Sequence, residues 1–134
     1  MKEDYVSFEL AKLLKEKGFD WGCYKVYNTE GVVGISTVIE DVPTNYKNRD
    51  YYFLCPTIQM AMKYLREVHN LFIEIHFWQD TYEDVCCEVG WKEPTYNYRI
   101  IGIGNNDADH VDIDFNSYES ACESAIEYCL TNLI

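Results

Sequence analysis

The sequence predicts an α+β fold in which an antiparallel, meander-rich sheet carries about three helices, packed mainly on one face. Apolar residues recur with helical spacing near the start, the middle and the end of the chain. Between the second and third of these stretches, short segments alternate between apolar and polar residues and are separated by turn residues, as in consecutive antiparallel strands. The 134 residues, 48% of them hydrophobic, suit a single domain spanning 1–134.

The helical pattern is clearest at 56–70, in the segment PTIQMAMKYLREVHN. Pro56 suits the first turn of a helix, where the missing N–H is not needed. Asn70 suits the left-handed position just past the helix end. The residues expected on one apolar face are Ile58, Ala61, Met62, Leu65 and Val68.

Two further helices are expected at 7–19 and 117–134. Ser7 and Ser117 are suitable N-cap residues, because a serine hydroxyl accepts a hydrogen bond from a free N–H of the first turn. Gly18 suits the left-handed stop of the first helix. On the last helix, the apolar face includes Cys122 and Cys129, which we expect to pack as small apolar residues.

The remaining segments are predicted to be strands and turns. Strands are expected at 22–28, 32–39, 51–54, 71–78, 82–91, 96–104 and 110–115. Residues 40–55 form a loop that contains the short strand at 51–54, and 79–81 form a turn. In the last strand, alternation predicts that Val111, Ile113 and Phe115 point inward.

The net charge of −12, from 11 basic and 23 acidic residues, argues against two classes of partner. Direct nucleic-acid binding needs clustered Lys and Arg, and so does binding to an anionic membrane surface. No apolar run approaches the length of a membrane-spanning helix, and the first ten residues lack the pattern of a secretory signal. We therefore expect a cytoplasmic protein.

The six cysteines include no C-x-x-C pair, so their spacing does not support a structural zinc site. Without an export signal, a disulfide framework is not expected either. Cys86 and Cys87 are adjacent, and in a continuous strand their side chains would lie on opposite faces, leaving one accessible. Because no base is identifiable beside them, no catalytic residue is assigned.

Three segments resemble a family of small uncharacterised proteins from prophages and mobile elements of gut bacteria. These segments are EDYVSFELAKLLKEKGF, PTIQMAMKYLREVHN and SYESACESAIEYCLTNLI, and they cover the three expected helices. Their motifs concern helix packing, and the family has no assigned activity. The resemblance therefore implies a phage accessory protein in a bacterial host and no particular chemistry.

The acidic C-terminal third is the first candidate binding site. Residues 100–134 contain seven acidic residues and neither Lys nor Arg, so a shared surface would suit a basic groove on a partner. The alternative is a solvated face that favours solubility or protects a strand edge. The candidate partner-binding residues, with two tyrosines from the loop, are Asp107, Asp109, Asp112, Asp114, Glu119, Glu123, Glu127, Tyr51 and Tyr52.

Glu74, His76 and Trp78 are the second candidate, as an alternative ligand site on the outer face of a strand. A His among carboxylates suits acid–base chemistry or metal binding, and half-exposed sheet positions are the simpler explanation. Asp107, Asp109 and Asp112 are candidates for an irregular calcium site, although their spacing departs from an EF-hand loop. No metal and no cofactor are therefore assigned.

Together these features favour a non-catalytic accessory protein that binds a host or phage protein through an acidic, tyrosine-containing surface. A domain that binds a small ligand or a metal, or a weak enzyme, is the first alternative. Self-association through exposed aromatic residues is the second.

Overall fold

The computed structural model of the chain describes residues 4–35 and 52–134, which form three α-helices and eight strands. The helices are α1 (Phe8–Glu16), α2 (Ile58–Val68) and α3 (Tyr118–Tyr128), and α3 continues into a π-helical turn, η2 (Cys129–Leu133). The strands are β1 (Lys25–Asn28), β2 (Val33–Ile35), β3 (Tyr52–Cys55), β4 (Leu71–Trp78), β5 (Thr81–Glu83), β6 (Val89–Trp91), β7 (Thr95–Gly102) and β8 (Asp109–Phe115).

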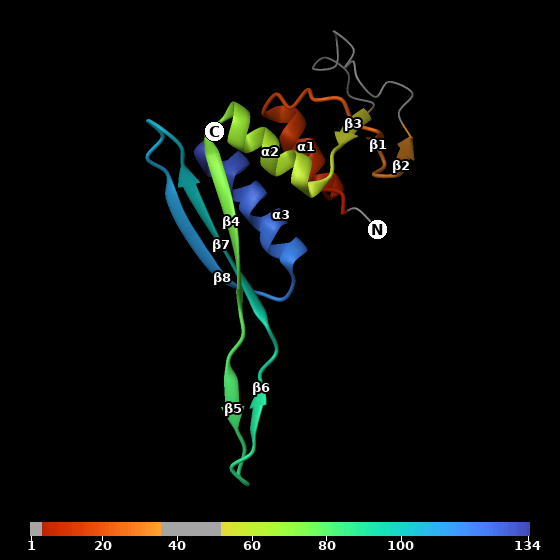
Figure 1. Ribbon diagram of the computed structural model, residues 1–134. Coiled ribbons are helices and arrows are strands. Elements are labelled where there is room, and N and C mark those ends of the chain that lie inside the picture. Colours follow the sequence, from red (N-terminus) through yellow and green to blue (C-terminus); the bar gives the residue numbers. More distant parts are fainter. Residues whose placement is uncertain (1–3, 36–51) are drawn as a thin grey trace.

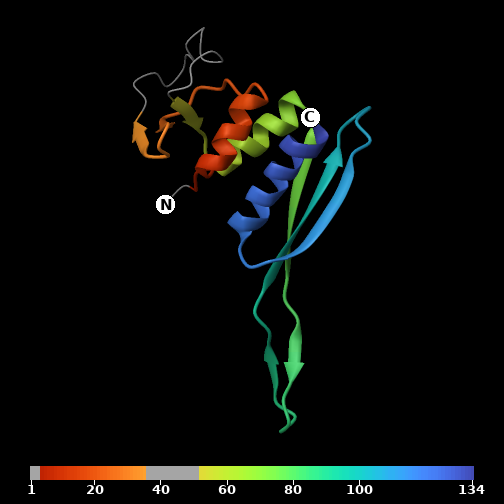
Figure 2. The ribbon, with the colours of Figure 1, turned by 180° about the vertical axis from the view of Figure 1, so that it is seen from behind.

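The main sheet is antiparallel, with the strand order β4-β7-β8. The helices all lie on one side of this sheet, with α3 lying against it (Figures 1 and 2). The other face of the sheet is not covered by any element of the described residues (Figure 1). The α+β class and the one-sided helix layer predicted from the sequence are confirmed.

The core forms where the inner face of this sheet meets the three helices. Ile73 and Ile100, which are direct partners in the β4–β7 pairing, are both buried beneath α3. The fully inaccessible residues of α3 and η2 are Ala121, Cys122, Ala125, Ile126, Cys129 and Leu130. Alanine and cysteine side chains are small, so they let the helix approach the sheet closely.

Local capping defines the helix ends. Ser7, Thr57 and Ser117 are the N-cap residues, and each side chain accepts a hydrogen bond from a first-turn N–H. The prediction is confirmed for the first and last helices. The central helix begins at Ile58, two residues later than expected, because Thr57 is its N-cap and Pro56 therefore precedes the helix instead of lying in its first turn. Asn70 has φ 56°, which confirms the predicted left-handed stop.

A second sheet, with the order β2-β1-β3, packs beside α1. The strands expected at 22–28 and 32–39 correspond to β1 and β2, which pair as an antiparallel hairpin with Val26 opposite Gly34. Residues 36–51 lie outside the described residues, and they include most of the predicted loop and the candidate Tyr51. The short strand expected at 51–54 is found at 52–55, paired with β1.

Strands β4 and β7 extend beyond the body of the protein as a long hairpin (Figure 1). The predicted turn at 79–81 and the predicted continuous strand at 82–91 are both wrong. The chain reverses at 84–88 instead, between β5 and β6. Asp84 fixes this reversal, since its Oδ1 accepts hydrogen bonds from the N–H groups of Cys86 and Glu88. We call residues 77–94 the hairpin arm.

Strand β8 corrects another prediction. Val111 and Ile113 are each 55% exposed, whereas Phe115 is partly buried and packs against the core, as predicted. The pairing of β7 with β8 is irregular between Tyr96 and Tyr98, and Asp114 adopts φ 70°. A β-bulge adds one residue to a strand, so the side chains before and after it alternate with opposite phase. Val111 and Ile113 therefore point outward, whereas Phe115 points inward.

The end of the β4–β7 pairing leaves no room for a side chain at Gly102. A Cβ atom there would lie 2.1 Å from the backbone oxygen of Asn106. We expect Gly102→Ala to lower the free energy of unfolding by about 1–3 kcal/mol, because the turn after β7 would have to move. The measurement is urea unfolding. Gly34→Ala is the control, because nothing lies within 4 Å of its Cβ position, and an equal loss in both variants would contradict the steric argument.

Candidate functional site

The hairpin arm carries a concentration of exposed large apolar side chains. Trp78 is 60% exposed and Trp91 is 68% exposed, and both are near the part of the arm closest to the sheet. The other exposed large apolar residues of the arm are Phe77, Tyr82, Val85 and Val89. A concentration of this kind on a protein surface is typical of an interaction site.

Both faces of the arm carry apolar side chains. Val89 and Trp91 pair with Glu83 and Thr81, so these four residues share one face. Tyr82 lies on the opposite face, where its ring covers Gly90: a Cβ at Gly90 would be 2.6 Å from the ring carbon Cζ. An aromatic ring across a glycine compensates for the missing side chain and stabilises a narrow ribbon.

The turn at the end of the arm combines two acidic residues, Asp84 and Glu88, with the exposed Val85 and two cysteines. Cys86 and Cys87 are both exposed, and Cys87 has φ 65°. The prediction that they occupy opposite faces of a strand is therefore wrong, because both belong to the turn. The arm contains five acidic residues and one lysine, so its net charge is 1 − 5 = −4; the acids are Asp80, Glu83, Asp84, Glu88 and Glu93.

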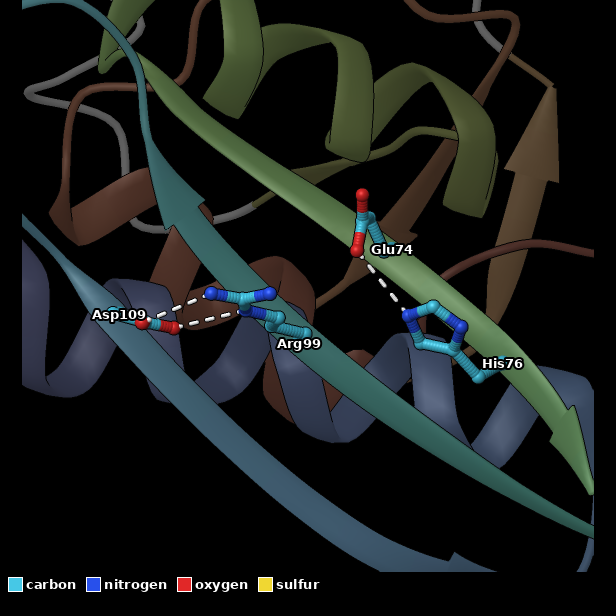
Figure 3. Close-up of polar contacts among 4 residues, drawn as sticks. All are labelled: Glu74, His76, Arg99 and Asp109. Carbon is cyan, nitrogen blue, oxygen red and sulfur yellow. Dashed lines mark hydrogen bonds and ion pairs between the residues drawn. The ribbon is translucent and has the colours of Figure 1, made fainter.

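The alternative ligand site lies on the outer face of the main sheet, next to the base of the arm (Figure 3). His76 Nε2 is 3.2 Å from Glu74 Oε2, so these two side chains are in contact on the same face of β4. Trp78 follows them along β4 and is exposed. Both polar side chains of the pair are accessible to solvent, which favours a weak surface contact over a preorganised site.

Arg99 and Asp109 form a second polar pair on this face (Figure 3). The Nε and Nη2 atoms of Arg99 donate to Oδ1 and Oδ2 of Asp109, at 3.0 and 3.1 Å. This bidentate hydrogen bond lowers the pKa of the Asp109 carboxyl group, against a small opposing effect of desolvation. Asp109 is therefore already paired with a cation of the same chain, on the surface of the sheet.

The structure divides the predicted acidic surface. Asp109 faces outward with Arg99, whereas Asp112 is opposite the buried Tyr98 in the pairing of β7 with β8. Glu123 is half-buried and its Oε1 accepts a hydrogen bond from the Ser7 N–H, at 2.9 Å. The other acidic candidates are also exposed: Asp107, Asp112, Asp114, Glu119 and Glu127. The seven acidic residues therefore do not form one continuous row.

No metal site assembles among the described residues. Asp109 and Asp112 project from β8 on different sides, so Asp107, Asp109 and Asp112 do not form the irregular calcium site that their sequence suggests. Throughout residues 4–35 and 52–134, no three His, Cys, Asp or Glu side chains are placed to hold a metal ion together.

Glu123 and Tyr52 serve the packing of α1. Burial raises the pKa of Glu123, the hydrogen bond from Ser7 opposes this shift, and the charge of Glu127 adds to it. Tyr52 is half-buried, and its backbone oxygen accepts a hydrogen bond from Lys15 Nζ at 2.9 Å. These contacts within the chain account for the positions of Glu123 and Tyr52.

The buried cysteines are poor nucleophiles. Desolvation raises the pKa of Cys122 to about 11, and it also raises the pKa values of Cys23, Cys55 and Cys129. Because the thiolate is the reactive form, these shifts make the four side chains unreactive at neutral pH. Their packing in the core agrees with the sequence interpretation for Cys122 and Cys129.

Apart from Trp78, the sequence-based candidates include no residue of the hairpin arm. Residues 77–93 are dense in tryptophan, tyrosine, valine and acidic residues, and this density was the signal in the sequence that could have indicated the arm. It was not informative by itself, because a strand that packs on the core would bury the same apolar side chains. None of the helices in the described part of the chain combines the length and the apolarity needed to cross a membrane. No family model, curated protein or solved structure matches the chain.

The environment of Glu123 predicts a pH effect on stability. A carboxyl group whose pKa is raised by folding stabilises the folded state below its unfolded pKa, near 4.5, and this contribution is lost as the pH rises through the folded pKa. We therefore expect the wild-type protein to lose stability relative to Glu123→Gln between pH 4 and pH 7. The amide oxygen of glutamine still accepts from Ser7.

Urea unfolding of both proteins at the two pH values gives this difference directly. Glu119→Gln is the matched control, because it makes the same charge change on an exposed position of α3. A difference between wild type and Glu123→Gln that stays constant with pH would contradict the assignment.

Proposed function

We propose that this protein is a non-catalytic accessory factor that binds another protein, and that the hairpin arm is its contact element. One observation carries the proposal: the arm projects from the body and exposes six large apolar side chains that no described element covers. Tryptophan and tyrosine dominate the energetics of protein interfaces, because each buries a large area with few rotatable bonds.

The stability of the fold does not explain these side chains. An isolated two-stranded ribbon is marginally stable in water, and exposed tryptophans add little to it unless something covers them. Natural sheets normally protect extended strands with charge or with a covering element. A partner that covers Trp78, Tyr82 and Trp91 would account for both the shape and the composition of the arm.

The acidic residues that support the proposal lie on the arm and not in the C-terminal third, where the sequence predicted them. The C-terminal acids are divided between two faces and partly engaged by Ser7 and Arg99. The arm itself keeps a net charge of −4 beside its aromatic residues. The resemblance of the helical segments to phage and mobile-element proteins supports a partner from a bacterial host or its phage.

The outer face of the main sheet supports the alternative of a ligand-binding domain. Glu74 and His76 are in contact there, and Trp78 is beside them. A thermal-shift screen with nucleotides and divalent metals tests this alternative, since a ligand that binds only the folded state raises the midpoint. A Glu74→Gln variant that keeps a ligand-induced shift would exclude this pair as the binding group.

The proposal predicts that Trp78→Ser/Trp91→Ser loses the partner while the fold is kept. Removing an interface anchor costs about 2 kcal/mol or more, so we expect the affinity to fall by at least about thirtyfold. The measurement is affinity capture from a bacterial lysate with quantitative mass spectrometry, followed by titration of the purified partner.

Val32→Ser/Val68→Ser is the matched control, because it also removes two exposed apolar side chains, outside the arm. Circular dichroism and urea unfolding show whether each variant is folded. Retention of the same partners by the folded arm variant would exclude the arm as the contact element.

A further inference from the structure

We propose that the partner receives the hairpin arm in a cleft with apolar walls and a rim of Lys and Arg side chains. This inference rests on the proposed function and specifies the chemistry of the partner. It follows from three properties of the arm: apolar side chains on both faces, their combined area, and an excess of carboxylates.

The distribution of apolar side chains requires a cleft rather than a flat surface. Val89 and Trp91 are on one face of the ribbon, and Tyr82 is on the other. At the far end, Val85 is fully exposed. A flat partner would cover one face and leave the other in water, whereas a cleft covers both faces and the end of the ribbon.

The area of the arm is on the scale of a specific interface. An aromatic side chain buries about 150–250 Å² when it is fully covered. Phe77, Trp78, Tyr82 and Trp91 are between 49% and 68% exposed. Together they therefore offer roughly 300–600 Å² of the about 800 Å² that each partner contributes to a standard interface. Val85 and Val89 add to this area.

The charge of the arm selects a basic partner. Glu83 shares a face with Trp91 and Val89, and Glu88 is in the exposed turn next to them. Carboxylates around an apolar centre suit cations at the rim of the opposing cleft, where they guide association. A second copy of this chain is disfavoured, because each copy carries −12 and each arm −4.

The first part of the test identifies what contacts the arm. The photo-cross-linking residue p-benzoylphenylalanine replaces Val85 in the full-length protein, and the control replaces the exposed Asn105 in the turn after β7. Irradiation in a bacterial lysate, followed by mass spectrometry, identifies the cross-linked protein and peptide. We expect a Val85-dependent cross-link to a protein whose contacted segment contains Lys or Arg among apolar residues.

The second part tests the charge with the purified cross-linked partner. We expect Glu83→Gln/Glu88→Gln to weaken binding by about twofold to thirtyfold, the range for two exposed ion pairs. Raising the salt concentration from 50 to 200 mM should weaken wild-type binding more than binding by this variant. Asp84 is kept, because it holds the turn. Asp107→Asn/Glu119→Gln is the control, with the same charge change outside the arm.

Each outcome has a defined meaning. Loss of affinity in the arm variant, with the control unchanged, supports the basic cleft. An arm-dependent partner that binds both variants equally overturns the basic cleft and leaves the proposed function standing. A cross-link to a second copy of the chain overturns the basic cleft in favour of self-association. The absence of any Val85-dependent cross-link overturns the proposed function together with the inference.

Discussion

The rest of the structure depends on the burial of one face of the main sheet beneath α3. Ile73 and Ile100 of the sheet and Ala125 and Ile126 of α3 belong to the same buried cluster, and the last three of these four side chains are completely inaccessible. Burying a large aliphatic side chain contributes about 1.5–3 kcal/mol to the free energy of folding. An exposed ion pair contributes at most about 1 kcal/mol, so a few of these buried side chains stabilise the fold more than the surface ion pairs of the described residues. The polar contacts of α3, including the one between Glu123 and Ser7, then set how α1 is placed against this layer.

This buried layer also determines the position of the hairpin arm. The arm continues the same two strands that carry Ile73 and Ile100, with β4 leading into β5 and β6 leading into β7. A one-residue shift in the pairing would expose the buried side chains of β4, so the core fixes the register. The arm has its own register, because two residues separate β4 from β5 whereas three separate β6 from β7. The place where the arm leaves the body is thus set by core residues of β4 and β7 that lie outside the arm.

The features that were predictable from the sequence are those that local chemistry decides. Ser7 and Ser117 cap their helices, and Asn70 adopts the left-handed conformation, because each depends on neighbours a few residues away. The bulge in β8 depends on its pairing with β7, so alternation within β8 could not reveal that Val111 faces out. The contact between Glu123 and Ser7 joins residues 116 positions apart, which no local pattern reports.

The arm illustrates a third kind of limit. Apolar and polar residues alternate along 82–91 as in a continuous strand, but the same sequence also fits two short strands joined by a turn. The side chain of Asp84 decides between these structures by accepting two backbone hydrogen bonds. Alternation also carries no information on what covers a side chain, so the exposure of Trp91 was invisible in the sequence.

From Glu74 to Asn97, a stretch that is described throughout, no residue is buried. The core residues and the exposed side chains of the arm therefore lie in separate parts of one hairpin, so the proposed recognition and the folding depend on different residues. Mutations in the outer part change the binding surface with little effect on the core, and mutations in the inner part do the reverse. This separation makes the chain evolvable: it can follow a changing partner, or acquire a new one, by drift in a short segment while its scaffold is conserved.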